Sequence, residues 1–166
     1  MKIDKLFNGL KRIANGDYVL EGDLISEETI EIDLDDRFVV KGRIESKKSI
    51  IIRHGIEAGD GIKAGCGIEA GWGIEAGCGI EAGCGIEAGC GIEAGDGIKA
   101  GWGIEAGWGI EAGAFISVKK RIFAGISIYR TSKDCDKTIR CTELRDGEVC
   151  YGDLILTGSE EKPDED

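Results

Sequence analysis

Acidic side chains recur at a fixed interval through the middle of the chain, from Gly55 to Ala114. This segment consists of ten hexapeptides with the pattern Gly-Ile-Glu-Ala-Gly-X, in which Lys63 and Lys99 twice replace the glutamate. The eight glutamates are Glu57, Glu69, Glu75, Glu81, Glu87, Glu93, Glu105 and Glu111. A regular row of carboxylates attracts cationic groups and repels polyanions. We therefore expect these glutamates to form an acidic face that binds a positively charged partner.

The last position of the repeat, X, holds side chains of very different size and chemistry. In chain order they are Asp60, Cys66, Trp72, Cys78, Cys84, Cys90, Asp96, Trp102, Trp108 and Ala114. Strict strand alternation would place X on the same side as Ile, inside the core. A close-packed core does not accept Asp, Cys and Trp interchangeably. We therefore expect X near the corners and partly exposed, with core filling as the alternative, and we expect Trp72, Trp102 and Trp108 to anchor a partner.

Catalysis and metal binding find little support among the other reactive side chains. The single histidine, His54, has no evident partner, and no cysteine has a histidine or lysine at the spacing of an activated nucleophile. Cys135, Cys141 and Cys150 lack the Cys-x-x-Cys spacing typical of zinc sites. We therefore expect a non-enzymatic protein that uses no cofactor and no metal.

The cysteine pattern and the absence of apolar runs bear on the compartment. The chain has 7 cysteines, and four of them occupy position X, which is not the pattern of a disulfide framework. No stretch approaches the roughly 20 apolar residues of a membrane helix, and the N-terminus lacks the apolar run of a signal peptide. A reduced cytoplasm is the expected location.

Glycine and negative charge dominate the composition of the 166 residues. The chain has 28 Gly but only 1 Pro, which excludes collagen, and 42% hydrophobic residues, which argue against disorder. The net charge is −11, from 32 Asp and Glu against 21 Lys and Arg. Nucleic acid and anionic membranes are therefore not expected as direct partners.

The elements that position these side chains are predicted to be short strands. Glycine at one position in three is incompatible with a stable helix, because each costs about 1 kcal/mol relative to alanine. Isoleucine favours strands, and glycine is expected to permit the bends between them. A short period in one chain predicts a β-solenoid, in which neighbouring coils pair along the axis.

The array resembles the hexapeptide-repeat β-helix, in which an aliphatic residue every sixth position is followed by Gly, Ala, Glu or Asp. Ile56-Glu57 and Ile68-Glu69 carry this likeness. The resemblance implies an all-β, single-stranded β-helix with triangular coils of about 18 residues, or three hexapeptides each. The wider strand pattern is also similar to the bactofilin-type β-helix, which forms polymers.

Charge placement gives a partial test of the coil length. With three hexapeptides per coil, Glu81 stacks between Lys63 and Lys99. With two hexapeptides per coil, Lys63 stacks beside Glu75, and Glu87 precedes Lys99. Both arrangements are electrostatically tolerable, although the first gives Glu81 opposite charges on both sides. We prefer three hexapeptides per coil because the resemblance implies that length.

The residues before and after the array fall into four predicted segments. Residues 1–16 are predicted to form a helical cap over Asp4–Ala14, with Leu6, Phe7, Leu10 and Ile13 on one face. Residues 17–54 are predicted to form irregular coils before the regular array at 55–114. Residues 115–157 are predicted to form final strands and a β-hairpin at 138–156, with its turn at Asp146-Gly147. Residues 158–166 are predicted to be a disordered acidic tail.

The charge density predicted for the array is similar to that of duplex DNA. One acidic residue on each of three faces, with coils about 4.8 Å apart, gives roughly one charge per 1.6 Å, against about 1.7 Å for DNA. The glutamates at 57, 75, 93 and 111 would stack without relief, which would raise the pKa of some carboxyl groups.

Two classes of function follow from this surface. The first is a decoy that binds a basic nucleic-acid-binding protein, similar to acidic DNA-mimicking solenoid inhibitors of the phage or plasmid anti-defence and anti-CRISPR type. The second is a scaffold that assembles end to end, as bactofilin-type proteins do, so that the partner is a second copy of the chain. A third interpretation is that the charges only keep a glycine-rich rod in solution.

Overall fold

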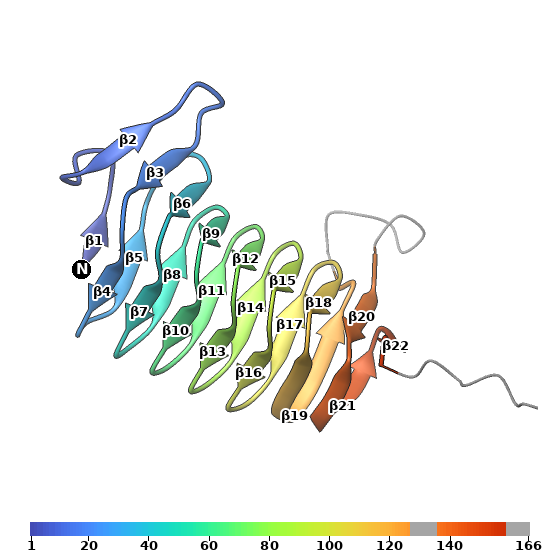
Figure 1. Ribbon diagram of the computed structural model, residues 1–166. Coiled ribbons are helices and arrows are strands. Elements are labelled where there is room, and N and C mark those ends of the chain that lie inside the picture. The colour runs from blue at the N-terminus through green and yellow to red at the C-terminus, as the bar shows by residue number, and fades with distance from the viewer. Residues whose placement is uncertain (127–135, 159–166) are drawn as a thin grey trace, which may run out of the picture.

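The chain folds as an all-β, single-stranded β-solenoid of about seven turns. The computed structural model describes residues 1–126 and 136–158, and this part of the chain contains no helix. It therefore contains no helix that is long and apolar enough to cross a membrane. Figure 1 shows the coils stacked along one axis, with the N-terminus at one end of the stack.

The strands stack in three columns, each formed by parallel pairing from coil to coil. Column 1 contains β3 (Tyr18–Leu20), β6 (Phe38–Val40), β9 (Ile56–Ala58), β12 (Ile74–Ala76), β15 (Ile92–Ala94), β18 (Ile110–Ala112), β20 (Thr138–Cys141) and β22 (Asp153–Leu156). Column 2 contains β1 (Lys2–Ile3), β5 (Ile30–Ile32), β8 (Ile50–Ile52), β11 (Ile68–Ala70), β14 (Ile86–Ala88), β17 (Ile104–Ala106) and the second half of β19 (Phe115–Ala124). Column 3 contains β4 (Leu24–Ser26), β7 (Ile44–Ser46), β10 (Ile62–Ala64), β13 (Ile80–Ala82), β16 (Ile98–Ala100) and the first half of β19.

The register repeats once per coil. In the array Ile62 pairs with Ile80, and Ile80 pairs with Ile98, so partners are separated by three hexapeptides. The coil that begins at Tyr18 is longer, because Tyr18 pairs with Phe38 at a greater separation in the sequence, whereas Phe38 pairs with Ile56 at the separation found in the array. Within each short strand of the array, Ile and Ala face inward and are buried, while Glu or Lys between them faces outward. The core is therefore a stack of isoleucines and alanines.

Glycine before X is required because neighbouring coils approach closely there. A Cβ built on Gly83 would lie 2.1 Å from the carbonyl oxygen of Gly65 in the coil before. None of the glycines of the array has a positive φ. Among the described residues, positive φ values occur only at glycines outside the array, such as Gly22 and Gly125. The expectation that glycine serves the bends through its backbone freedom is therefore wrong for the array, where the constraint is steric.

The X residues form ladders along the three corners of the solenoid. The backbone N–H of Cys84 donates a hydrogen bond of 3.0 Å to the carbonyl oxygen of Cys66, and that of Trp102 does the same to Cys84. None of the ten X side chains is buried, and Trp72 and Trp102 are 55% and 61% exposed. The prediction of partly exposed corners is confirmed, and the alternative of core filling is wrong.

This register predicts a single disulfide pair among the cysteines of the array. Cys66 and Cys84 are neighbours in one corner ladder, whereas Cys78 stacks between aspartates and Cys90 between tryptophans. Adjacent strands lie about 4.8 Å apart, within the Cα separation of about 4.4–6.8 Å that disulfides adopt. Oxidised glutathione is therefore expected to link Cys66 to Cys84, with two thiols oxidised and two glutathione molecules released, as mapped by peptide mass spectrometry.

Serine variants provide the controls for this linkage. Cys66→Ser should abolish the disulfide, and Cys78→Ser should leave it unchanged. A linkage between Cys66 and Cys78 would contradict the observed register, because those two cysteines are neighbours only in coils of two hexapeptides.

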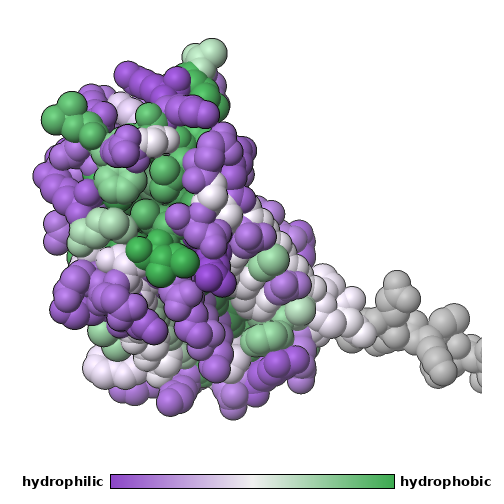
Figure 2. All heavy atoms as spheres, turned by 60° about the vertical axis from the view of Figure 1, so that its left-hand side comes forward, coloured by the Kyte–Doolittle hydropathy of each residue, from purple (hydrophilic) through white to green (hydrophobic). Residues whose placement is uncertain are grey.

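The N-terminal segment forms turns and strands instead of the predicted helix over 4–14. Strand β2 (Leu10–Arg12) pairs antiparallel with β3 and so covers the first edge of column 1. The apolar spacing of this segment is compatible with a helix and with a strand. The strand forms because it pairs with the otherwise open edge of β3. Lys5 Nζ and the Tyr18 hydroxyl each donate a hydrogen bond of 2.7 Å to Asp35, which lowers the pKa of that carboxyl group. Figure 2 brings this side of the molecule forward and shows hydrophobic patches between hydrophilic side chains.

The C-terminal segment forms a further parallel coil instead of the predicted hairpin at 138–156. Strand β20 pairs in parallel with β22, and β21 (Glu143–Tyr151) runs through Asp146-Gly147 alongside β19. A two-residue hairpin turn of the expected type needs positive φ at both central residues. Only Gly147 has one (φ 111°). Of the tail predicted at 158–166, residues 159–166 lie outside the described part of the chain, as does Cys135.

Candidate functional site: the acidic groove of column 2

The outward positions of column 3 alternate in charge. Lys63 Nζ lies 3.6 Å from Glu81 Oε2, and Lys99 Nζ lies 3.8 Å from Glu81 Oε1. The predicted stacking of Glu81 between two lysines is therefore confirmed. Because Glu45 occupies the outward position before Lys63, acids and bases take turns along this column, and its net field is weak.

The four glutamates of column 1 do not stack without relief, contrary to the prediction. Arg37 Nη2 lies 2.6 Å from Glu57 Oε2 and 2.5 Å from Glu75 Oε2. At the other end Arg140 Nη1 lies 3.5 Å from Glu111 Oε2. Arg37 belongs to the longer coil that precedes the array, and Arg140 belongs to β20. Both cations lie outside the repeats, so the repeat pattern alone did not reveal them.

Column 2 carries three consecutive carboxylates without an ion pair to any described residue. Glu69, Glu87 and Glu105 stack in direct register on β11, β14 and β17. Among the ion pairs of the described residues, none involves these three side chains, although glutamates of both other columns have such partners. Partial burial of Glu87, together with the charges of Glu105 and Glu69, raises the pKa of its carboxyl group.

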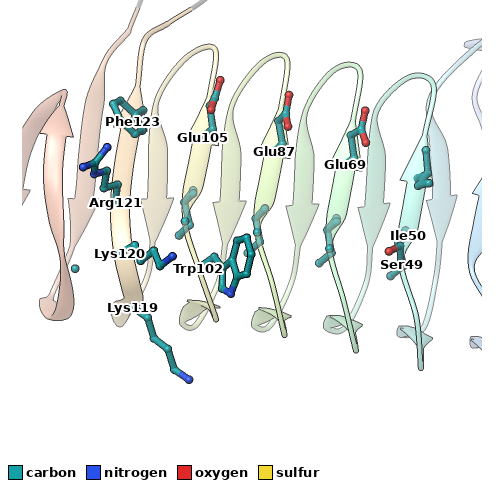
Figure 3. Close-up of a pocket in the computed structure, with 18 of the residues that line it drawn as sticks. Ser49, Ile50, Glu69, Glu87, Trp102, Glu105, Lys119, Lys120, Arg121 and Phe123 are labelled. Carbon is teal, nitrogen blue, oxygen red and sulfur yellow. The ribbon is translucent and has the colours of Figure 1, made fainter.

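A groove of about 1010 Å³ runs along this column. Its floor contains the three carboxylates, and the hydrophobic side chains Ile51 and Phe123 occupy the outward positions at either end of the row. Figure 3 shows the glutamates in a line, with Trp102 beside the strands below them. The groove therefore combines three adjacent negative charges with apolar and aromatic contact area.

One end of the groove is basic. Lys119, Lys120 and Arg121 of β19 line it, and Lys120 Nζ lies 4.7 Å from the centre of the Trp102 ring. This cation–π contact holds Trp102 against the basic end. These residues follow the array and have no counterpart in the repeat, so the sequence analysis did not single them out.

The other two tryptophans line a second, smaller groove. Trp72 and Trp108 lie on the corner before column 1, in a groove of about 550 Å³ whose glutamates include the ion-paired Glu75 and Glu111. The predicted aromatic anchors are therefore divided between two sites, and only Trp102 accompanies the row of Glu69, Glu87 and Glu105.

The remaining reactive side chains form no further site within the described ranges. The His54 ring packs edge-on against Trp72, with centroids 5.0 Å apart, and its Nδ1 atom has no hydrogen-bond partner. Residues 1–126 and 136–158 contain no group of three or more His, Cys, Asp or Glu side chains placed to hold a metal ion.

Opposite effects on stability are expected from neutralising Glu87 and Glu81. A raised carboxyl pKa means that the folded state holds the proton more tightly, so ionisation weakens the fold as the pH rises through and above the ordinary value of 4.5. Glu87→Gln should therefore stabilise the protein by about 0.5 kcal/mol at pH 7, because it removes like charges opposite each other. The gain should vanish at pH 3, where the wild-type carboxyl is protonated, as measured by thermal unfolding.

Glu81→Gln is the matched control on the neighbouring column. It makes the same chemical change where the neighbours are Lys63 and Lys99, so it should destabilise the protein by about 0.5 kcal/mol at pH 7. Effects of equal sign for both variants would contradict the assignment of Glu81 and Glu87 to different columns.

Comparison with protein-family models, with curated proteins and with solved structures found no match to this chain.

Proposed function

We propose that this protein is a non-enzymatic, cytoplasmic binding module whose column 2 groove holds the basic surface of a nucleic-acid-binding protein. The observation that carries the proposal is the row of Glu69, Glu87 and Glu105, which has no ion-pair partner among the described residues and lies beside exposed Trp102. Carboxylates that remain unneutralised in a fold with many ion pairs favour an external cation. A raised pKa at Glu87 agrees with this, because such shifts gather at functional sites.

The geometry changes the form of the expected DNA mimicry. Ion pairs weaken the fields of columns 1 and 3, and of the array glutamates without an ion pair to a described residue only Glu93 lies outside column 2. Most of the unneutralised charge therefore lies on one side of the rod, at one carboxylate per coil, or roughly 4.8 Å. This is sparser than the charge of duplex DNA. The proposed decoy therefore competes with nucleic acid along a single strip, and the basic end at Lys119–Arg121 fixes the direction in which a partner lies.

Competition with DNA tests this function. The immobilised protein should retain DNA- or RNA-binding proteins from a bacterial lysate at about 50 mM salt and release them at about 500 mM salt or on addition of duplex DNA. Replacing Glu69, Glu87 and Glu105 together by Gln should reduce this retention about tenfold or more.

The same charge change on column 1 provides the control. Replacing Glu57, Glu75 and Glu93 by Gln should leave retention within about twofold of the wild type, because two of these carboxylates already have Arg37 as a partner. Equal losses for both triple variants would show that only net charge matters. Retention that duplex DNA does not reverse would contradict the decoy function.

A further inference from the structure

The column 2 groove presents one outward side chain per coil along the solenoid axis. From the N-terminal side of the groove these are Ile51, Glu69, Glu87, Glu105 and Phe123, which stack in register on consecutive coils. Figure 3 shows the three glutamates on successive strands. Neighbouring coils lie about 4.8 Å apart, so the carboxylates span roughly 10 Å and the two hydrophobic residues roughly 19 Å. The row is therefore acidic over three even steps and hydrophobic one step beyond at each end.

The strands beneath the three carboxylates are already paired on both sides. Strand β11 lies between β8 and β14, β14 lies between β11 and β17, and β17 lies between β14 and β19. A partner that adds a strand needs an exposed sheet edge, and the floor of this groove is not an edge. A partner in the groove is therefore recognised through its side chains, and their spacing along the axis decides which secondary structure fits.

An α-helix that lies along the solenoid axis matches the spacing of the row. One face of a helix presents a side chain about every 5.4 Å, so five successive positions on that face span roughly 21 Å, close to the 19 Å of the row. An extended strand presents a side chain to one face about every 6.7 Å, so five positions span roughly 27 Å. The strand is then out of register by more than one coil, whereas long basic side chains absorb the small mismatch of the helix.

Glycines along one side of the row leave the groove open to another backbone. Gly67, Gly85 and Gly103 line the groove immediately before the strands that carry the glutamates. The solenoid accepts side chains at this position, since Ser49 and Arg121 occupy it in the coils on either side of these three. A Cβ built on Gly85 would lie 3.5 Å from the nearest atom, at an ordinary van der Waals distance. Packing within the chain therefore does not require glycine at Gly85, and its missing side chain makes room in the groove.

We propose that the groove holds a basic amphipathic α-helix of the partner, which lies along the solenoid axis with Lys or Arg on three consecutive turns of one face. This inference rests on the proposed function and specifies which element of a nucleic-acid-binding protein the groove takes. Such proteins commonly place an α-helix in the major groove of DNA, so a helix with basic side chains is available to a decoy. The three basic turns pair with the carboxylates, and apolar residues one turn further out contact Ile51 and Phe123. Trp102 adds contact area beside the row.

The charge at one end of the groove determines the direction of the helix. Lys119, Lys120 and Arg121 line the end at which Phe123 lies. The C-terminus of a helix carries a partial negative charge, which these cations attract. The partner helix therefore points its C-terminus toward β19 and its N-terminus toward β8.

Three synthetic peptides of equal net charge test the proposal on the full wild-type chain. The first has Lys at i, i+4 and i+7 and Leu at i−3 and i+11, which places all five on one helix face. The second has the same composition with Lys at i, i+2 and i+4 and Leu at i−2 and i+6, which is the face of a strand. The third is the first peptide with one internal Ala replaced by Pro, which breaks the helix. By fluorescence anisotropy at about 50 mM salt, the first should bind about tenfold or more tighter than the other two, and circular dichroism should show that it gains helix on binding.

The direction of the helix is tested by one added charge. The first peptide with a Glu after its last Leu should bind about threefold or more tighter than the same peptide with the Glu before its first Leu. The opposite preference would overturn the assigned direction.

A pair of glycine variants locates the helix in the groove. Gly85→Leu fills the space beside the row and should weaken binding of the first peptide about tenfold or more. Gly73→Leu makes the same change at the equivalent position of column 1, where a Cβ would lie 3.4 Å from the nearest atom, and should leave the affinity within about twofold of the wild type. Because the peptide comparison uses the wild-type protein, it decides the question even where Gly85→Leu fails to fold.

The outcomes separate this inference from the proposed function. Equal affinities for the three peptides, or tightest binding of the peptide with the strand pattern, would overturn the helix and leave a basic partner in the groove. Failure of all three peptides to bind would also overturn it. The proposed function is decided separately, by whether duplex DNA reverses the retention of proteins from a lysate.

Discussion

Gly83→Ala is expected to destabilise the solenoid by about 3 kcal/mol, a large effect for the addition of one methyl group. The new Cβ would lie 2.1 Å from the carbonyl oxygen of Gly65, and it would also lie 3.0 Å from the carbonyl carbon. Both obstructing atoms belong to the backbone of the neighbouring coil, so no side chain can rotate out of the way. The two coils must move apart, which lengthens the hydrogen bonds on both sides of the corner.

Gly85→Ala is the control, a little further along the same corner. A Cβ there would lie 3.5 Å from the nearest atom, the carbonyl oxygen of Gly103, at an ordinary van der Waals distance. This variant should change stability by no more than about 0.5 kcal/mol. Thermal unfolding followed by circular dichroism measures both variants, and similar losses would show that backbone freedom, and not close approach, sets the requirement for glycine.

Ile50→Ala should destabilise the protein by about 2–5 kcal/mol, because it opens a cavity in the isoleucine stack. Ile50 is fully buried on β8, between Ile30 of the coil before and Ile68 of the coil after. Its neighbours are fixed by hydrogen bonds along the column, so they cannot collapse into the space. Chemical denaturation with the same optical signal gives the loss of unfolding free energy.

Ile51→Ala is the matched variant on the same strand. Ile51 faces outward, is 40% exposed, and lines the acidic groove. Its truncation should cost no more than about 0.5 kcal/mol in stability. A cost equal to that of Ile50→Ala would contradict the inward and outward assignment of β8.

The sequence predicts the array well because every coil repeats the same local requirements. Isoleucine at every sixth position determines the core, and the outward glutamate follows from the alternation of a short strand. The stacking of Glu81 between Lys63 and Lys99 also followed from the repeat, since these residues share one column once the register is known. Self-similar neighbours make the long-range partners readable from the local pattern.

The two ends could not be predicted in the same way. The apolar spacing of Leu6, Phe7 and Leu10 suits a helix face, but the free edge of β3 requires a pairing strand, which is a requirement set by residues far along the chain. Asp146-Gly147 has the composition of a tight turn, yet β21 continues through it because pairing with β19 satisfies the backbone on one side. Local preference was overridden at both ends by an edge that only the folded solenoid creates.

The candidate site was predicted in composition but not in position. Eight glutamates were expected to act as one acidic surface, and the cations that divide them, Arg37 and Arg140, come from coils outside the repeats. Their reach depends on loop length and strand register, which the repeat does not encode. Which glutamates remain without an ion pair therefore depends on residues of the irregular coils that flank the array.

Because each array coil consists of three hexapeptides, the number of hexapeptides determines the rotation of the chain about the solenoid axis between the two ends of the array. Each hexapeptide advances the chain by roughly 1.6 Å along the axis and turns it by about 120°. Gain or loss of one hexapeptide would therefore turn the coils that follow the array by about a third of a turn relative to the coils that precede it, while gain or loss of three would restore the relative orientation and change only the length. Duplication within the gene could thus change how the two flanks of the array face one another without changing any side chain in either flank.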